Sequence, residues 1–283
     1  MSKKPGSLIN ILTFILVAVV AVFIVITINS EDNKAVLSAG FQSLAQGVLP
    51  DEAAAMEASV EPSEVVLPFK VGETLTYGVT FKRVKIGTST LTFLGTAEID
   101  GKQTYLIRFY TDTIYLKDTE KIYADKETFL PLRVERDVNK SIGFSERIVE
   151  EYDQENFTLT VSKKGFVRKD QQTITSSGPI HNAILLSYLY RADLDAKKEE
   201  TFAVNLPTKQ FDLSFGGKEE VDVPLGMFEA CVFSSEPSQF SLWIADDGIK
   251  TPLMIEDPQT FGYALKLKAI EQVEEQDVIA QAE

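Results

Sequence analysis

Residues 74–81 read TLTYGVTF, and the pattern of this stretch decides the fold class. Its larger apolar side chains occupy every second position, at Leu75, Tyr77, Val79 and Phe81. Because successive side chains of a β-strand point to opposite faces, the stretch predicts a strand with one apolar and one polar face. Such strands are typical of antiparallel sheets that are solvated on one side.

The same alternation continues along the chain, between segments rich in turn-forming residues. Asp100-Gly101 predicts a two-residue hairpin turn, and Gly216-Gly217 predicts another turn. Alternation mixed with charge at Ile148, Glu150 and Tyr152 predicts an edge or strongly exposed strand. The further expected strands are residues 120–124, 132–138, 144–152, 157–163, 166–174, 202–206, 211–215, 227–233, 240–244, 253–255 and 263–270.

The period of the pattern changes once, to that of a helix. Apolar residues with helical spacing then share one face, at Ile180, Ile184, Leu185, Tyr188 and Leu189. Pro179 suits the first helical position, and Arg191 suits the C-terminal end, where a cation is favourable. We therefore predict a mainly β fold: a strongly curved antiparallel sheet, or open barrel or clam, with one crossing helix.

A different kind of segment precedes this sheet. Residues 8–28 read LINILTFILVAVVAVFIVITI and contain no charged side chain. As a helix, this run is long enough to cross a bilayer core of about 30 Å. Lys3 and Lys4 lie before the run, and Glu31 and Asp32 lie after it. This asymmetry predicts a single-pass signal anchor in the inner membrane, with the bulk of the chain on the periplasmic side.

A cleaved secretory signal is the alternative interpretation of residues 8–28. The apolar run exceeds the usual length of such signals, and no A-x-A pattern follows it. A lipoprotein anchor would need a nearby cysteine, but the only cysteine is Cys231.

The predicted organisation has five parts: a cytoplasmic N-terminus (1–7), the transmembrane helix (8–28), a tether (29–67), a β-rich domain (68–273) and an acidic tail (274–283). The first part of the tether fits either an amphipathic helix at the membrane surface or an irregular continuation of the anchor. Residues 50–62, PDEAAAMEASVEP, predict a flexible spacer.

Composition argues against several classes of function. The 283 residues are 44% hydrophobic and 25% charged, which suits a globular protein with a core. A net charge of −14 argues against nucleic-acid binding and against adhesion to anionic lipid headgroups through a basic patch. A single cysteine permits no intramolecular disulfide.

Several segments in a fixed order resemble the DUF3108 family of bacterial exported proteins. They are FKVGETLTYGVTF (69–81), LPLRVER (130–136), AILLSYLYR (183–191), VPLGMFEACVF (223–233), LWIADDGIKTPLMIE (242–256) and FGYALKLK (261–268). The resemblance implies an envelope β-protein and supplies no activity. The family usually has Arg where Lys250 stands, and Lys250 cannot form a bidentate fork to a carboxylate.

The residues offer little support for catalysis or metal binding. His181 is the only histidine, and we interpret it as a polar residue at the helix start. Asp246-Asp247-Gly248 lacks the spacing of a calcium loop and predicts a turn. Glu150 and Glu151 cannot converge as an acid/base pair, because neighbouring strand residues face opposite ways. We therefore expect no enzyme, metal or cofactor.

The chain is rich in aromatic residues, with 18 Phe and 9 Tyr. They can simply fill the sheet core, or a curved sheet can leave an apolar cleft for an acyl chain. The hypothetical cleft would have the helix as its lid and be lined by Tyr77, Phe81, Phe93, Phe109, Leu213, Phe215 and Trp243.

The leading functional hypothesis is a membrane-tethered, non-enzymatic envelope domain that binds a hydrophobic ligand or a lipidated partner. One alternative is an assembly factor that contacts another envelope protein through a sheet edge. A third hypothesis, a cell-wall glycan-processing enzyme, needs convergent carboxylates that the sequence does not show.

Overall fold

The computed structural model describes residues 67–165, 169–258, 262–274 and 278. The expected cytoplasmic N-terminus, transmembrane helix and nearly all of the tether lie outside the described residues, as does most of the tail. Among the helices of the described part, none has both the length and the apolar character needed to cross a membrane.

The described residues form one sheet of 14 strands, all paired antiparallel, so the predicted mainly β, antiparallel class is confirmed. The strands are β1 (Glu73–Phe81), β2 (Val84–Ile99), β3 (Lys102–Thr113), β4 (Leu116–Asp125), β5 (Pro131–Lys140), β6 (Glu146–Asp153), β7 (Thr158–Gly165), β8 (Lys169–Thr175), β9 (Phe202–Leu206), β10 (Lys209–Val223), β11 (Gly226–Glu236), β12 (Ser241–Ala245), β13 (Pro252–Asp257) and β14 (Tyr263–Gln272).

Two runs of consecutive hairpins make up this sheet. Its strand order is β8-β7-β6-β5-β4-β3-β2-β1-β14-β13-β12-β11-β10-β9. The β1–β14 pair joins the two runs, and its register places Leu75 opposite Ile270. The first and last strands of the order, β8 and β9, are therefore the two edges of an open sheet.

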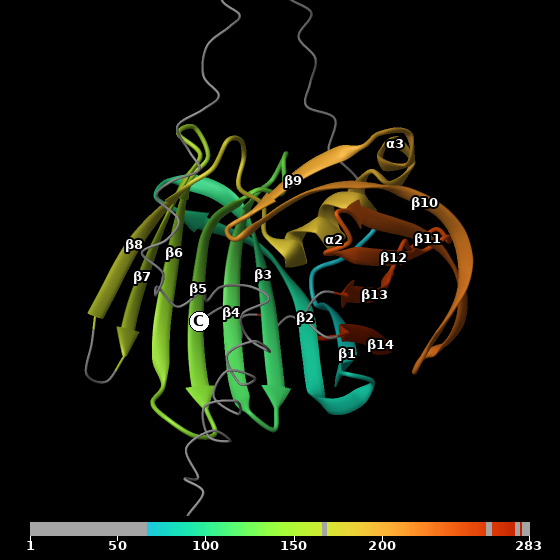
Figure 1. Ribbon diagram of the computed structural model, residues 1–283, viewed down its shortest axis with the longest axis horizontal. Coiled ribbons are helices and arrows are strands. Elements are labelled where there is room, and N and C mark those ends of the chain that lie inside the picture. Colours follow the sequence, from blue (N-terminus) through green and yellow to red (C-terminus); the bar gives the residue numbers. More distant parts are fainter. Residues whose placement is uncertain (1–66, 166–168, 259–261, 275–277, 279–283) are drawn as a thin grey trace, which may run out of the picture. The chain divides into compact units, whose positions relative to one another are not determined.

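The chain passes from one edge to the other through two helices, α2 (Ala183–Ala192) and α3 (Leu194–Glu199). Figure 1 shows the sheet bending around α2, which lies on its concave side. Side chains on every side of α2 are buried, as expected for a helix enclosed by a curved sheet. Helix α2 is the predicted crossing helix, whereas the short α3 was not predicted.

The start of α2 differs from the prediction. Pro179 is not the first helical residue, because the backbone of Ile180 and His181 pairs with Asn205 of strand β9. The His181 N–H donates to the Asn205 carbonyl at 2.7 Å. The helix begins only after Asn182, whose side-chain oxygen accepts from the Ile184 and Leu185 N–H groups and so caps the first turn.

The prediction of a turn at Gly216-Gly217 is wrong. Strand β10 continues without a break from Lys209 to Val223, and the glycines form a bulge in its pairing with β11. Gly217 has a φ of 116°, a conformation that glycine adopts at no steric cost. The Asp100-Gly101 turn is confirmed, with both residues at positive φ.

The core lies on the concave side, between the sheet and α2. Leu75, Tyr77 and Val79, the residues that first indicated a strand, are completely buried. On α2, Tyr188 packs edge-on against Phe69, with ring centroids 4.9 Å apart, and Tyr190 packs similarly against Phe233 at 4.5 Å. Phe69 precedes β1, but the Tyr188 ring also lies 6.2 Å from that of Phe93 in β2, so the helix contacts aromatic residues of both runs of strands.

Candidate functional site

The seven residues of the predicted apolar cleft all belong to the main core or pack against it. Tyr77, Phe93, Phe109 and Leu213 are buried, whereas Phe81 and Phe215 are partly buried against the core. Trp243 is also nearly buried, and its indole Nε1 donates to Glu219 Oε1 at 2.6 Å.

These residues contact other side chains of the core. Phe93 packs on Phe69 and Tyr105, with ring centroids 5.0 and 5.5 Å apart. The Tyr77 hydroxyl donates to the Pro252 carbonyl at 2.9 Å. The two cavities described below have other linings, and the apolar cleft stays a prediction.

A cluster of charged side chains lies on the same concave face, farther along the sheet. Strand β4 contributes Asp118 and Glu120, β5 contributes Arg136, and β6 contributes Glu150 and Tyr152. None of the four charged residues is more than 4% exposed. The register of β4 with β5 places Glu120 opposite Arg136, which explains how the cation reaches the acids.

Arg136 is the central member of this acidic cluster. Its Nη2 donates to Asp118 Oδ2 and lies 3.4 Å from Glu120 Oε1. The Tyr152 hydroxyl donates to Glu150 Oε2 at 2.6 Å. One guanidinium thus faces three carboxyl groups, and the cluster carries an excess of acid.

Burial shifts the ionisation of these groups. It raises the pKa of Glu120 to about 8, since Asp118 and Glu150 add to the effect and Arg136 only partly opposes it. Burial likewise raises the pKa of Glu150. For Arg136, burial lowers the pKa, but the surrounding carboxylates outweigh it and hold the pKa above its ordinary value. The buried carboxyl groups of Glu120 and Glu150 therefore hold protons to higher pH than solvated carboxyl groups do.

Several polar atoms of the cluster lack a hydrogen-bond partner among the described residues. They are Asp118 Oδ1, Glu150 Oε1, and Nε and Nη1 of Arg136. A buried polar atom without a partner costs about 1–3 kcal/mol, so such atoms call for an explanation.

Two adjoining cavities lie beside this cluster. The inner cavity, of about 10 Å³, is lined by Glu120, Arg136, Glu150 and Tyr152 on one side and by residues 181–183 and 206–208 on the other. The outer cavity, of about 380 Å³, lies between the end of β8 and the β9–β10 turn. Both are lined by Leu206, Pro207 and Thr208, which therefore form the wall between them.

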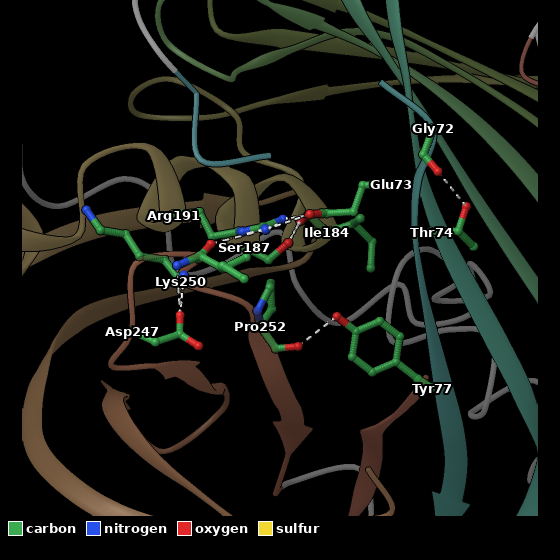
Figure 2. A network of polar contacts seen from close by, with 11 residues as sticks. Gly72, Glu73, Thr74, Tyr77, Ile184, Ser187, Arg191, Asp247, Lys250 and Pro252 are labelled. Atoms are coloured by element: carbon green, nitrogen blue, oxygen red, sulfur yellow. Dashed lines mark hydrogen bonds and ion pairs between the residues drawn. The ribbon is translucent and has the colours of Figure 1, made fainter. Parts of the chain in front are cut away.

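A second buried ion pair differs from the acidic cluster because both oxygens of its carboxylate accept hydrogen bonds (Figure 2). Arg191 of α2 forms a fork to Glu73 of β1, with Nη1–Oε1 and Nη2–Oε2 distances of 2.6 and 3.0 Å. Arg191 Nη2 also donates to the Ile249 carbonyl at 3.3 Å. This bidentate pair fastens the helix to the sheet, a structural role that we did not predict for Arg191.

Lys250, where the family usually has Arg, lies near this pair but takes no part in the fork. Figure 2 shows its side chain directed away from Glu73. Its backbone N–H donates to Asp247 Oδ1 at 2.7 Å, and Ile249 N–H donates to the same oxygen at 2.9 Å. Asp247 thus closes the predicted turn at 246–248, which is confirmed.

His181 has the surroundings of a neutral core residue. Its Nδ1 accepts from the Asn205 N–H at 3.2 Å, and its ring packs edge-on against Phe202. Burial lowers its pKa to about 4, so it is uncharged at neutral pH. It nevertheless lines the inner cavity beside the acidic cluster.

The position of strand β6 in the sheet contradicts the prediction of an edge or exposed strand. Glu150 and Tyr152 predicted an exposed or edge strand, but β6 is an interior strand paired with β5 and β7. Arg136 and the Tyr152 hydroxyl compensate for burying Glu150. Glu150 and Glu151 do face opposite ways, as predicted, but Glu150 instead converges with acids from another strand.

Comparison with known structures finds chains with low identity to this one. A β-barrel-like protein of the domain of unknown function DUF1849 from Brucella abortus is 10% identical, with a TM-score of 0.43 over 72% of this chain and 98% of that chain. A "putative exported protein with YmcC-like fold" from Bacteroides fragilis is 11% identical, with a TM-score of 0.27 over 73% of this chain and 98% of that chain.

The search of curated proteins finds no match. Residues 76–268 match the family described as "Protein of unknown function (DUF3108)", which covers the sheet from β1 to β14 and both helices. The chain therefore belongs to the DUF3108 family.

Proposed function

We propose that this protein is an extracytoplasmic binding domain that takes up an amphipathic small molecule at the β9–β10 turn. Residues 8–28 would hold it at the membrane. The observation that carries the proposal is the pair of adjoining cavities, one of them ending at buried acids that lack full hydrogen bonding.

The outer cavity suits the apolar part of such a molecule. Its volume of about 380 Å³ is within the range of small-molecule sites, roughly 300–1,000 Å³. Ile174, Ile180 and Leu206 supply apolar lining, and Thr175, Ser176 and Gln210 supply polar groups. A ligand here would meet both kinds of surface.

The inner cavity selects the polar group of the ligand. Its volume of about 10 Å³ is near the minimum for a single water molecule. The oxygens of Asp118 and Glu150 are acceptors, so a cationic or hydrogen-bond-donating group such as an amine would satisfy them. Entry requires residues 206–208 to move, because they separate the two cavities.

Native mass spectrometry of the full-length protein released from its own membranes tests this proposal. Thr208→Trp should block the passage, since Thr208 lines both cavities. Thr201→Trp is the matched control, because Thr201 is exposed and lines neither of these cavities. We expect a bound small molecule in the wild type and in Thr201→Trp, and its loss in Thr208→Trp. Equal retention by all three proteins, or no bound molecule in any, would refute the proposal.

One observation favours a second candidate, a glycan-processing enzyme. Carboxyl groups of three different residues converge after all, and burial raises the pKa of Glu120, as suits a general acid. The inner cavity is far too small for a sugar ring, so the binding proposal fits the geometry better. Release of reducing sugar ends from cell-wall glycan by the wild type, and its loss in Glu120→Gln, would favour the enzyme instead.

A further inference from the structure

Four hairpin turns of the first run of strands lie at one end of the sheet. They connect β1 to β2, β3 to β4, β5 to β6 and β7 to β8, and antiparallel pairing places them side by side. Figure 1 shows the first three along the lower end of the sheet. We call this row of turns the hairpin rim. Residues 166–168 of the fourth turn are not described, and nothing below depends on them.

Large apolar side chains are exposed on the hairpin rim. Val84 in the first turn is 63% exposed, Ile114 in the second is 66% exposed, and Ile142 and Phe144 in the third are 82% and 63% exposed. Single exposed apolar residues are ordinary, but several in adjacent turns indicate an interaction surface.

The charges of the rim separate into two cationic ends and a neutral centre. The first turn, residues 80–87, contains Lys82, Arg83 and Lys85, all exposed, and no acid. At the other end, Lys163, Lys164 and Lys169 are accompanied only by Asp170 among the described residues of the fourth turn.

The central turns are balanced by local ion pairs. Lys117 pairs with Asp112 at 3.2 Å, and Lys140 pairs with Glu146 at 2.8 Å. The rim is therefore cationic at both ends and apolar in the middle, although the whole chain has a net charge of −14.

We infer that the hairpin rim docks on the surface of an anionic lipid bilayer. Apolar side chains flanked by lysine and arginine are the combination that binds the boundary between headgroups and acyl chains. Cations near a negative membrane surface add attraction that weakens with salt. The overall acidity of the chain does not oppose this contact, since the acids lie mainly outside the rim and salt screens distant charges.

An environment-sensitive fluorophore on the rim tests the inference. Full-length Ile142→Cys, carrying the label NBD, is reconstituted into vesicles of phosphatidylcholine with or without a quarter of phosphatidylglycerol. The native Cys231 is buried, so labelling is directed to the new thiol. Met227→Cys is the matched control, because Met227 is also apolar and is 62% exposed, but lies in the β10–β11 turn outside the rim.

We expect lipid-borne quenchers to quench the Ile142 label in vesicles containing phosphatidylglycerol, and to leave the Met227 label unaffected. Removing the first-turn charges by Lys82→Asn, Arg83→Asn and Lys85→Gln should weaken this docking at least about tenfold. Asparagine suits positions 82 and 83, whose φ values are 50° and 65°. Unchanged Trp243 emission would show that the triple variant is folded.

Several outcomes would overturn the inference. An Ile142 label that stays in water in both kinds of vesicle excludes lipid docking, as does equal quenching of the Met227 label. Quenching that appears only when other membrane proteins are present assigns the rim to a protein partner instead. None of these outcomes depends on whether a small molecule binds at the β9–β10 turn.

Discussion

Replacing Glu120 by glutamine should change how stability depends on pH. The folded protein raises the pKa of Glu120 from 4.5 to about 8, chiefly by burial. Between these two values the folded state keeps a proton that the unfolded state has released. The free energy of unfolding therefore falls as pH rises through this window. Glutamine resembles the protonated acid, and Glu120→Gln should remove this loss.

The size of the effect follows from the shift. A shift of about 3.5 pKa units, at 1.36 kcal/mol per unit, corresponds to a wild-type loss on the order of 4 kcal/mol between pH 5 and 8.5. Comparing wild type with variant at each pH cancels the contributions of other groups. The two proteins should be similarly stable at pH 5 and should differ increasingly as pH rises above 5.

Urea unfolding of the full-length protein, followed through the single Trp243, measures this difference. Trp243 is a suitable reporter because it is nearly buried and bonded to Glu219. Glu151→Gln is the matched control, since Glu151 is exposed on the opposite face, and it should shift stability by less than about 0.5 kcal/mol at every pH. A difference between wild type and Glu120→Gln that stays constant from pH 5 to 8.5 would refute the assigned ionisation.

Three further variants test other parts of the fold. Arg191→Lys should lower the free energy of unfolding by about 2 kcal/mol, because lysine cannot reproduce the fork to Glu73. Arg147→Lys, in an exposed ion pair, should lower it by less than about 0.5 kcal/mol; chemical unfolding measures both. Gly87→Ala should cost about 1–3 kcal/mol, because its Cβ would clash with the Asp112 carbonyl oxygen, whereas the Cβ of Gly248→Ala would meet open space. Equal unfolding midpoints of the two variants would contradict this. His181→Gln should reduce the rise of the unfolding free energy between pH 4 and 6.5, because the unfolded wild type binds a proton there that the buried neutral ring does not. A variant whose unfolding free energy rises with pH as steeply as that of the wild type would count against this.

The strands and the main helix were predictable because burial on one face leaves a periodic pattern. Leu75, Tyr77 and Val79 alternate strictly, and all three are completely buried. Gly216-Gly217 was misread because a glycine pair fits either a turn or a bulge, and only pairing with β11 distinguishes them. The start of α2 was displaced by contacts between His181 and Asn205 of β9, which lie 24 residues apart in the sequence.

The acidic cluster was the part that sequence reasoning missed. Asp118 and Glu120 lie on the same, buried face of β4 as Ile122 and Ala124. The alternation along this strand therefore did indicate that the two acids face the core. Charged residues usually lie on the solvated face, and burial here depends on Arg136 from the neighbouring strand. Strand register, which local patterns do not specify, brings these groups together.

A comparison of two short amphiphiles tests the binding proposal most directly. Octylamine and octanoate have chains of equal length and opposite charge, and calorimetric titration of the full-length protein gives the affinity for each. We predict that octylamine binds at least tenfold more tightly, and that Thr208→Trp abolishes this binding while Thr201→Trp does not. Equal affinity for the two compounds, or tighter binding of octanoate, would contradict a site that ends at the carboxyl groups of Asp118, Glu120 and Glu150.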